Sequence, residues 1–251
     1  MRSYLYRMSF VLIGLLVLCF SARGTAQENS GNTREVMGEV LDSFVSLIPY
    51  MSSELVFNDS SKEEEIEKHL KQLKSSFAKT EHLKALKTPA FMPSMKSLND
   101  HLDQTVEVFE ADNKSFALTR LKSTTGLCIS CHTQLPPSKR GAFHSALKKV
   151  GRQDFQSDFE YAEFLFMTRN YVKSLRFYEN AIQEKLEKAK SGENPGGKNT
   201  SYHKVRQSLK RALTVYTKIR YNPTQAHNFL DKFDDHEGLS PMTKKEVRGW
   251  M

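Results

Sequence analysis

Apolar residues recur at three- and four-residue steps along most of the chain, with polar residues between them. Four such stretches fill the first half: about 33–52, a second after Asp59-Ser60-Ser61, a third after Pro93, and a fourth from about 113 to 132. This spacing gathers apolar side chains on one face of a helix. No strand-like alternation is present, so the pattern predicts an all-α chain that begins with a four-helix bundle.

The expected helix ends have local causes. Glu63-Glu64-Glu65 falls in the first turn of the second helix, where free backbone amides and the helix dipole favour acids. The stretch Thr88–Pro93 separates the second helix from the third, and Pro136-Pro137 is expected to stop the fourth.

The first 26 residues have the pattern of a secretory signal peptide. Arg2 and Arg7 precede an apolar run over 10–20, and small residues lead to a cleavage site expected after Ala26. The run is shorter than the about 20 residues of a spanning helix, so we expect a periplasmic chain with no membrane span after cleavage. A lipid anchor on Cys19 is disfavoured because Leu18 precedes it, where a small residue is expected.

Two cysteines and a histidine end the fourth helical stretch. The sequence GLCISCHTQLPP contains Cys128, Cys131 and His132, and after leader cleavage these are the only cysteines left. C-x-x-C-H is the attachment sequence of c-type haem, in which two thiols bind the vinyl groups and the histidine binds the iron. With one such motif, the sequence predicts one covalent haem c and no second haem in this chain.

Three other uses of a cysteine pair compete with haem attachment. A thioredoxin-like redox pair would sit beside a βαβ pattern, which is missing here. A zinc site would need two further ligands at suitable spacing, and no second cluster is present. A structural disulfide is the main remaining alternative, while export and the helical setting favour haem.

The first half resembles the cytochrome c′ group, the c-type cytochromes built as four-helix bundles with haem near the end of the last helix. The resemblance covers residues 30–137 and rests on Arg34-Glu35-Val36-Met37 in the first helix and Cys128-Ile129-Ser130-Cys131-His132 closing the fourth. It implies a haem domain of that fold, and a homodimer formed through the bundle is compatible with it.

Met37 is the candidate for the second axial iron ligand. In an up-down-up-down bundle the end of the fourth helix lies beside the start of the first. Met51 lies 14 residues further on, roughly 21 Å along the helix and too far from the iron. The resemblance implies methionine ligation near the start of the first helix in low-spin members and an apolar residue there in gas-binding members. Plain core packing is the alternative role for Met37.

The other histidines are weaker candidates for metal ligands. His69, His82 and His101 lie in or near charged helical segments, so we expect them to face solvent rather than to bind metal. His144 follows the attachment helix and could approach a haem edge, although nothing in the spacing requires it.

After a linker that begins at Pro136, the second half, 142–251, has a different pattern. The stretch 162–182 resembles a tetratricopeptide repeat, with Ala162, Ser174 and Ala181 as small positions, and 222–233 resembles the second helix of a similar unit. Two such units are too few for a free-standing solenoid, because about three are needed to bury a continuous core. We therefore expect part of this tetratricopeptide-like helical-hairpin domain to pack on the bundle or on a partner. A hairpin extension without a binding role is the alternative.

Charge differs between the halves. Residues 27–140 hold 14 Lys/Arg against 16 Asp/Glu, whereas 141–251 hold 20 against 13, a net charge of +7. Export argues against nucleic acid as the partner of this basic half and favours an acidic protein or a membrane surface.

The sequence predicts an exported mono-haem cytochrome in periplasmic electron transfer. Its expected partners are the haem c maturation machinery and an acidic redox protein docked by the helical module. A gas-binding or sensing cytochrome with an open iron position is one alternative, and a scaffold with a structural haem is another. No general acid–base set or second cofactor motif indicates an enzyme.

Overall fold

The regular structure of the chain is helical wherever it is described. A computed structural model describes residues 24–134, 148–191 and 197–251, with side chains over 33–134, 148–191 and 202–251. Within these ranges there is no β-strand, which confirms the all-α prediction. No helix in the described part is long and apolar enough to cross a membrane.

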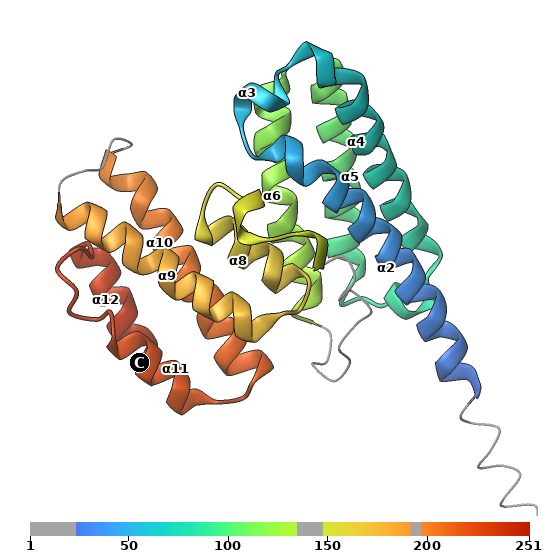
Figure 1. Ribbon diagram of the computed structural model, residues 1–251. Helices are drawn as coiled ribbons and strands as arrows, with labels where there is room; N and C mark the ends of the chain where they lie inside the picture. The colour runs from blue at the N-terminus through green and yellow to red at the C-terminus, as the bar shows by residue number, and fades with distance from the viewer. Residues whose placement is uncertain (1–23, 135–147, 192–196) are drawn as a thin grey trace, which may run out of the picture.

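Four long helices make up the first half, and each packs against the next in chain order (Figure 1). They are α2 (Gly24–Met51), α4 (Glu63–Ala78), α5 (Met92–Glu110) and α6 (Lys114–His132), with the short α3 (Glu54–Phe57) after α2. Contact between α2 and α6 is much less extensive than that between consecutive long helices. The four expected helical stretches are therefore all present.

Local sequence explains where these helices begin. Asp59 accepts a hydrogen bond from the backbone amide of Ser61 and caps the turn that leads into α4, whose first turn holds the three predicted glutamates. The tight connection between α5 and α6 passes through Asp112, which has a left-handed backbone with φ 59°. Aspartate tolerates that conformation better than most residues, so the chain can reverse there within a few residues.

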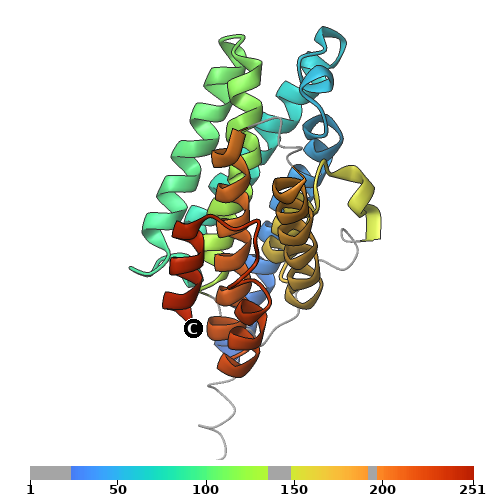
Figure 2. The same ribbon diagram turned by 90° about the vertical axis from the view of Figure 1, so that its left-hand side faces the viewer.

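Within its described residues, the second half is a series of five helices (Figure 2). They are α8 (Asp158–Met167), α9 (Tyr171–Lys190), α10 (Gly197–Thr214), α11 (Pro223–Asp231) and α12 (Pro241–Trp250), with a π-helical turn over 215–219 after α10. The first four pack on one another in chain order, and the last is joined to the third by the ion pair between Arg206 and Glu246. The small positions noted in the sequence lie at these contacts, since Ala162 and Ser174 are fully buried.

Helix α8 joins the two halves. It packs against both α6 and α9, and every residue from Tyr161 to Met167 is buried. The main hydrophobic core consequently runs without interruption from Leu41 in α2 to Val247 in α12. The expectation that part of the second half packs on the first is confirmed.

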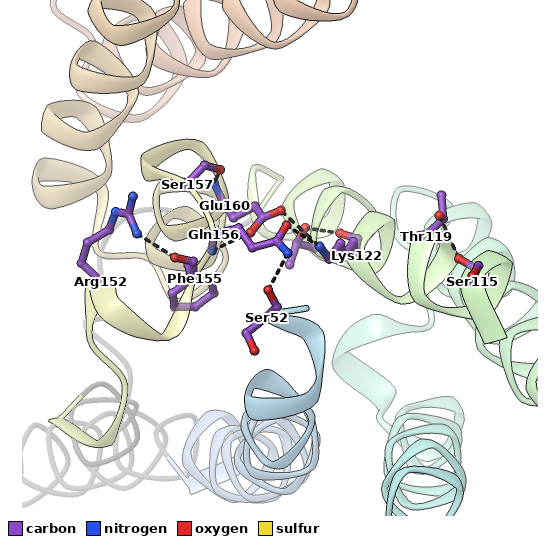
Figure 3. A network of polar contacts seen from close by, with 10 residues as sticks. Ser52, Ser115, Thr119, Lys122, Arg152, Phe155, Gln156, Ser157 and Glu160 are labelled. Carbon is purple, nitrogen blue, oxygen red and sulfur yellow. Dashed lines mark hydrogen bonds and ion pairs between the residues drawn. The ribbon is translucent and has the colours of Figure 1, made fainter. Parts of the chain in front are cut away.

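A polar network also ties the two halves together (Figure 3). Lys122 of α6 donates to the side chain of Gln156 at 3.0 Å and lies 3.5 Å from Glu160 of α8. Gln156 in turn donates to the backbone carbonyl of Ser52 at the end of α2. These contacts fix the segment before α8 against α2 and α6.

Some predicted features fall outside the described residues. Cys19, His144, the paired prolines at 136–137 and nearly all of the predicted leader are among them. Helix α2 begins at Gly24 and contains Ala26, so cleavage after Ala26 stays a prediction.

Candidate haem-attachment site

The cysteine–histidine motif forms the last turn of α6. At 3.6 residues per turn, Cys128, Cys131 and His132 lie on the same side of this helix as Leu121 and Thr124, which are both buried. The motif therefore lies on the buried side of α6, where Cys128 packs against the main hydrophobic core and His132 reaches α8. Haem attachment at this position stays a prediction.

Both thiols of the motif are free and half-buried. Cys128 packs against the main hydrophobic core. Desolvation raises the pKa of Cys128 to about 12, with a further contribution from Cys131, and burial also raises the pKa of Cys131. Both side chains are therefore neutral thiols at neutral pH, and the folded chain holds no disulfide between them.

One ring nitrogen of His132 forms a hydrogen bond within the protein. Its Nδ1 lies within hydrogen-bond distance of the backbone carbonyl of Met167 at the end of α8. Because a carbonyl oxygen only accepts, Nδ1 carries the proton. Burial, with a smaller contribution from the nearby positive charge of Arg169, lowers the pKa of His132 to about 4, although the hydrogen bond to Met167 opposes this shift. The ring is thus neutral at neutral pH, and no residue in the described part of the chain hydrogen-bonds to Nε2, whose lone pair is the one that binds a metal.

The start of α5 lies level with the motif. His101 donates a hydrogen bond from Nε2 to the backbone carbonyl of Arg120 at 2.8 Å, and the same nitrogen lies 3.4 Å from the hydroxyl of Ser123. Since α5 and α6 are antiparallel, residues about six to nine positions before His101 lie opposite the part of α6 that carries the motif. Met92 and Met95 occupy those positions, Met92 exposed and Met95 buried.

A second, smaller apolar cluster lies at this end of the helices. It is separate from the main core and draws on the first described turns of α2, the segment after α4 and the start of α5; its members are Val36, Leu83, Leu86 and Met95, with Met37 and Phe91 packed against them. Met37 is half-buried within it. The predicted ligand therefore lies in an apolar setting, and the same cluster holds a second methionine, Met95.

Sequence reasoning missed Met95 as a candidate ligand and missed the Met167 carbonyl. Met95 belongs to the apolar stripe of α5, where a methionine fits core packing equally well. A backbone carbonyl carries no sequence signal at all, so only the fold reveals that α8 orients His132.

The remaining histidines differ in their surroundings. His82 is exposed as expected, whereas His69 and His101 are half-buried, so the expectation that they face solvent is wrong for these two. No group of three or more His, Cys, Asp or Glu side chains in the described part of the chain is arranged to hold a metal ion by itself.

In comparisons with known proteins, no family model, curated protein or solved structure matches the chain. Any assignment of this site therefore depends on its own chemistry. Two free thiols and an imidazole with an unoccupied Nε2, all on the inner face of one helix end, fit the set that covalent haem attachment requires. A partner for the second ring nitrogen of a ligating histidine is a usual feature of such sites.

The half-buried His101 should make stability depend on pH. Burial is the main cause that lowers its pKa, and the charge of Arg120 adds to it. The unfolded chain therefore binds a proton more readily than the folded one, so stability present above about pH 6.5 is lost as the pH falls below it. We expect the free energy of unfolding of His101→Gln, measured by urea titration, to fall less from pH 7 to pH 5 than that of the unchanged protein. His82→Gln, an exposed control, should leave the fall unchanged; equal falls in all three proteins would contradict the role of His101.

Proposed function

We propose that this chain is an exported mono-haem c-type cytochrome that transfers electrons, with its N-terminal helices acting as a four-helix bundle of the cytochrome c′ kind. The observation that carries the proposal is the state of the motif: two free thiols on the inner face of α6 and a neutral His132 whose Nδ1 is held by Met167. Bound haem would supply an iron that cycles between two oxidation states.

The chain's own residues have defined tasks in this proposal. Cys128 and Cys131 would hold the porphyrin through thioether bonds, and His132 would present Nε2 to the iron, with the orientation of its ring fixed by the Met167 carbonyl. The apolar cluster around Met37 would shield this end of the helices from water. Burial is one of the factors by which a protein sets the redox potential of a haem.

Met37 is the proposed second axial ligand, and the test distinguishes it from Met95. The mature protein is produced with a haem c maturation system, and visible spectra are recorded in the ferric and the dithionite-reduced form. We expect sharp, split low-spin bands after reduction. Leucine substitution keeps the volume of a methionine and costs less than about 1.5 kcal/mol, so the fold should survive. Met37→Leu should lose the low-spin bands, whereas Met95→Leu and the exposed control Met92→Leu should keep them.

Each other outcome has a definite meaning. Loss of the low-spin bands in Met95→Leu alone would assign the ligand to Met95 and overturn Met37. Broad high-spin bands in the unchanged protein would overturn electron transfer through six-coordinate iron and favour a gas-binding protein. The packing of Met37 among apolar side chains is the observation that favours that second candidate.

We further propose that the second half is a tetratricopeptide-like module that docks an acidic redox partner. Support comes from the buried small positions between α8 and α9 and from the net charge of +7 on residues 141–251. Electrostatic docking weakens as salt screens surface charge. Electron transfer to an acidic partner should therefore slow as ionic strength rises, and a rate that does not respond to salt would contradict the docking role.

A further inference from the structure

A cleft lies on the side of α6 opposite the cysteines. It has a volume of about 500 Å³ and is lined by the end of α2, by α6, by the segment leading into α8, by α8 itself and by α10. Thr119, Lys122 and Gly126 line it and lie 120–180° around α6 from Cys128 at 3.6 residues per turn. The cleft is thus distinct from the haem-attachment site, and its volume is that of a small-molecule site between packed units.

The surface of the cleft is mainly apolar. Phe44 and Ile48 from α2 and Phe155 and Phe159 from the α8 region contribute its apolar side chains. Phe44 and Ile48 are almost fully buried, which makes that wall part of the packed core rather than a mobile surface. Such a wall suits a chain or ring of carbon atoms.

The carboxylates that line the cleft already have hydrogen-bond donors. Each accepts from a neighbour in the fold: Asp154 from the backbone of Gly151 at 2.7 Å, Glu160 from the backbone of Gln156 at 3.1 Å, and Glu163 from Tyr178 at 2.5 Å and Arg211 at 3.0 Å. Each carboxylate in the lining therefore has at least one hydrogen-bond donor within the protein.

The side chains of α10 that line the cleft have no such hydrogen-bond partners among the described residues. His203, Lys204 and Gln207 lie within one helical turn and line the cleft together. Within the described part of the chain, Lys204 forms no ion pair, and its ammonium lies 5.8 Å from the centre of the Phe159 ring. Among the described residues, Lys204 and Asp154 are therefore the charged side chains of the lining that form no ion pair. Asp154 accepts from the Gly151 amide, whereas the ammonium of Lys204 has only the aromatic wall beside it.

We propose that this cleft binds a small amphipathic carboxylate, with its apolar body against Phe155 and Phe159 and its carboxylate held by Lys204 and Gln207. The match is chemical: an apolar wall takes the carbon chain, and the unpaired ammonium and amide supply charge-assisted hydrogen bonds to the anionic end. An uncharged or a cationic molecule would leave the ammonium of Lys204 without an acceptor.

Octanoate is the probe, and isothermal titration calorimetry on the mature protein is the measurement. We expect saturable binding of one octanoate per chain, and binding of octylamine that is weaker by about tenfold or more, because it lacks the charge-assisted hydrogen bond. Binding of octylamine as tight as that of octanoate, or no saturable binding of octanoate, would overturn the proposal.

Surface variants locate the anionic end without disturbing the core. Lys204→Gln should weaken octanoate binding by about tenfold, the loss of one charged hydrogen bond. Gln207→Glu should weaken it at least as much, because it places a negative charge on the same wall. Lys245→Gln changes charge by the same amount as Lys204→Gln, at an exposed position on α12, and should leave binding unchanged. Equal effects of the two lysine variants would place octanoate elsewhere and overturn the assignment.

Discussion

Replacing both Cys128 and Cys131 with serine is expected to abolish covalent haem in the protein. The two thiols are free and lie on the inner face of α6, and burial keeps them protonated in the folded chain through their raised pKa values. A thiol in that state is a poor nucleophile. We therefore expect haem to be attached before α6 packs, while the motif is still open to the maturation system. Serine cannot form the thioether bonds, so haem stain on a denaturing gel should fall to background.

The control for this experiment lies between the two cysteines. Ser130 is exposed, and its hydroxyl donates to the carbonyl of Leu127 within α6. Ser130→Ala alters the same turn without removing a thiol and should keep the full haem stain. Circular dichroism of the double variant checks that helix content is retained. Haem that stays on the double variant through denaturation, or unchanged protein that never carries covalent haem, would contradict the attachment site.

The helices of the first half could be predicted from sequence because each helix buries one face, on which apolar residues recur at three- and four-residue steps. Asp59, the glutamates of the first turn of α4 and the proline at the start of α5 are local signals, and they predict helix starts to within a few residues. The motif itself is local as well, so Cys128, Cys131 and His132 could be found without a structure.

Contacts between distant parts of the chain could not be predicted in the same way. The period of apolar residues indicates which face of a helix is buried but not which neighbour buries it. Met167 lies 35 residues from the histidine that it orients, and His101 lies 19 residues from the carbonyl that it contacts. The cleft opposite the cysteines is a further case, since it needs five segments to come together. Polar residues of α6 that line it are indistinguishable in sequence from an exposed helix face.

The buried position of Glu163 was likewise not foreseen, because glutamate in a helix normally faces solvent. Only 5% of its side chain is exposed, and it pairs with Arg211 of α10. Tyr178 of α9 donates to the same carboxylate at 2.5 Å, and burial together with that carboxylate raises the pKa of this tyrosine well above its usual value. Arg211 also reaches α6, since a Cβ added at Gly126 would lie 3.6 Å from its guanidinium. One carboxylate thus joins α8, α9 and α10 directly and α6 through its arginine.

Glu163→Ala is therefore expected to destabilise the protein by about 3 kcal/mol. Removing one member of a buried pair leaves the other charge without compensation, and here a tyrosine hydroxyl also loses its acceptor. The value lies at the low end for such pairs because 22% of the Arg211 side chain remains exposed and can be hydrated. Urea unfolding followed by circular dichroism gives the free-energy difference directly.

Two further variants separate the charge effect from lost packing. Tyr178→Phe removes one hydrogen bond and keeps the ion pair, so it should cost only about 1 kcal/mol. In the triple variant Tyr178→Phe, Glu163→Leu and Arg211→Met, both charges and the hydroxyl that donates to Glu163 are replaced by apolar groups of similar size, and stability should return to near that of the unchanged protein. If the triple variant is as unstable as Glu163→Ala, the loss comes from packing and the ionic account is wrong. If it recovers, the pair contributes little net stability, and its effect is to penalise any packing of α8 against α9 and α10 that leaves either charge unpaired.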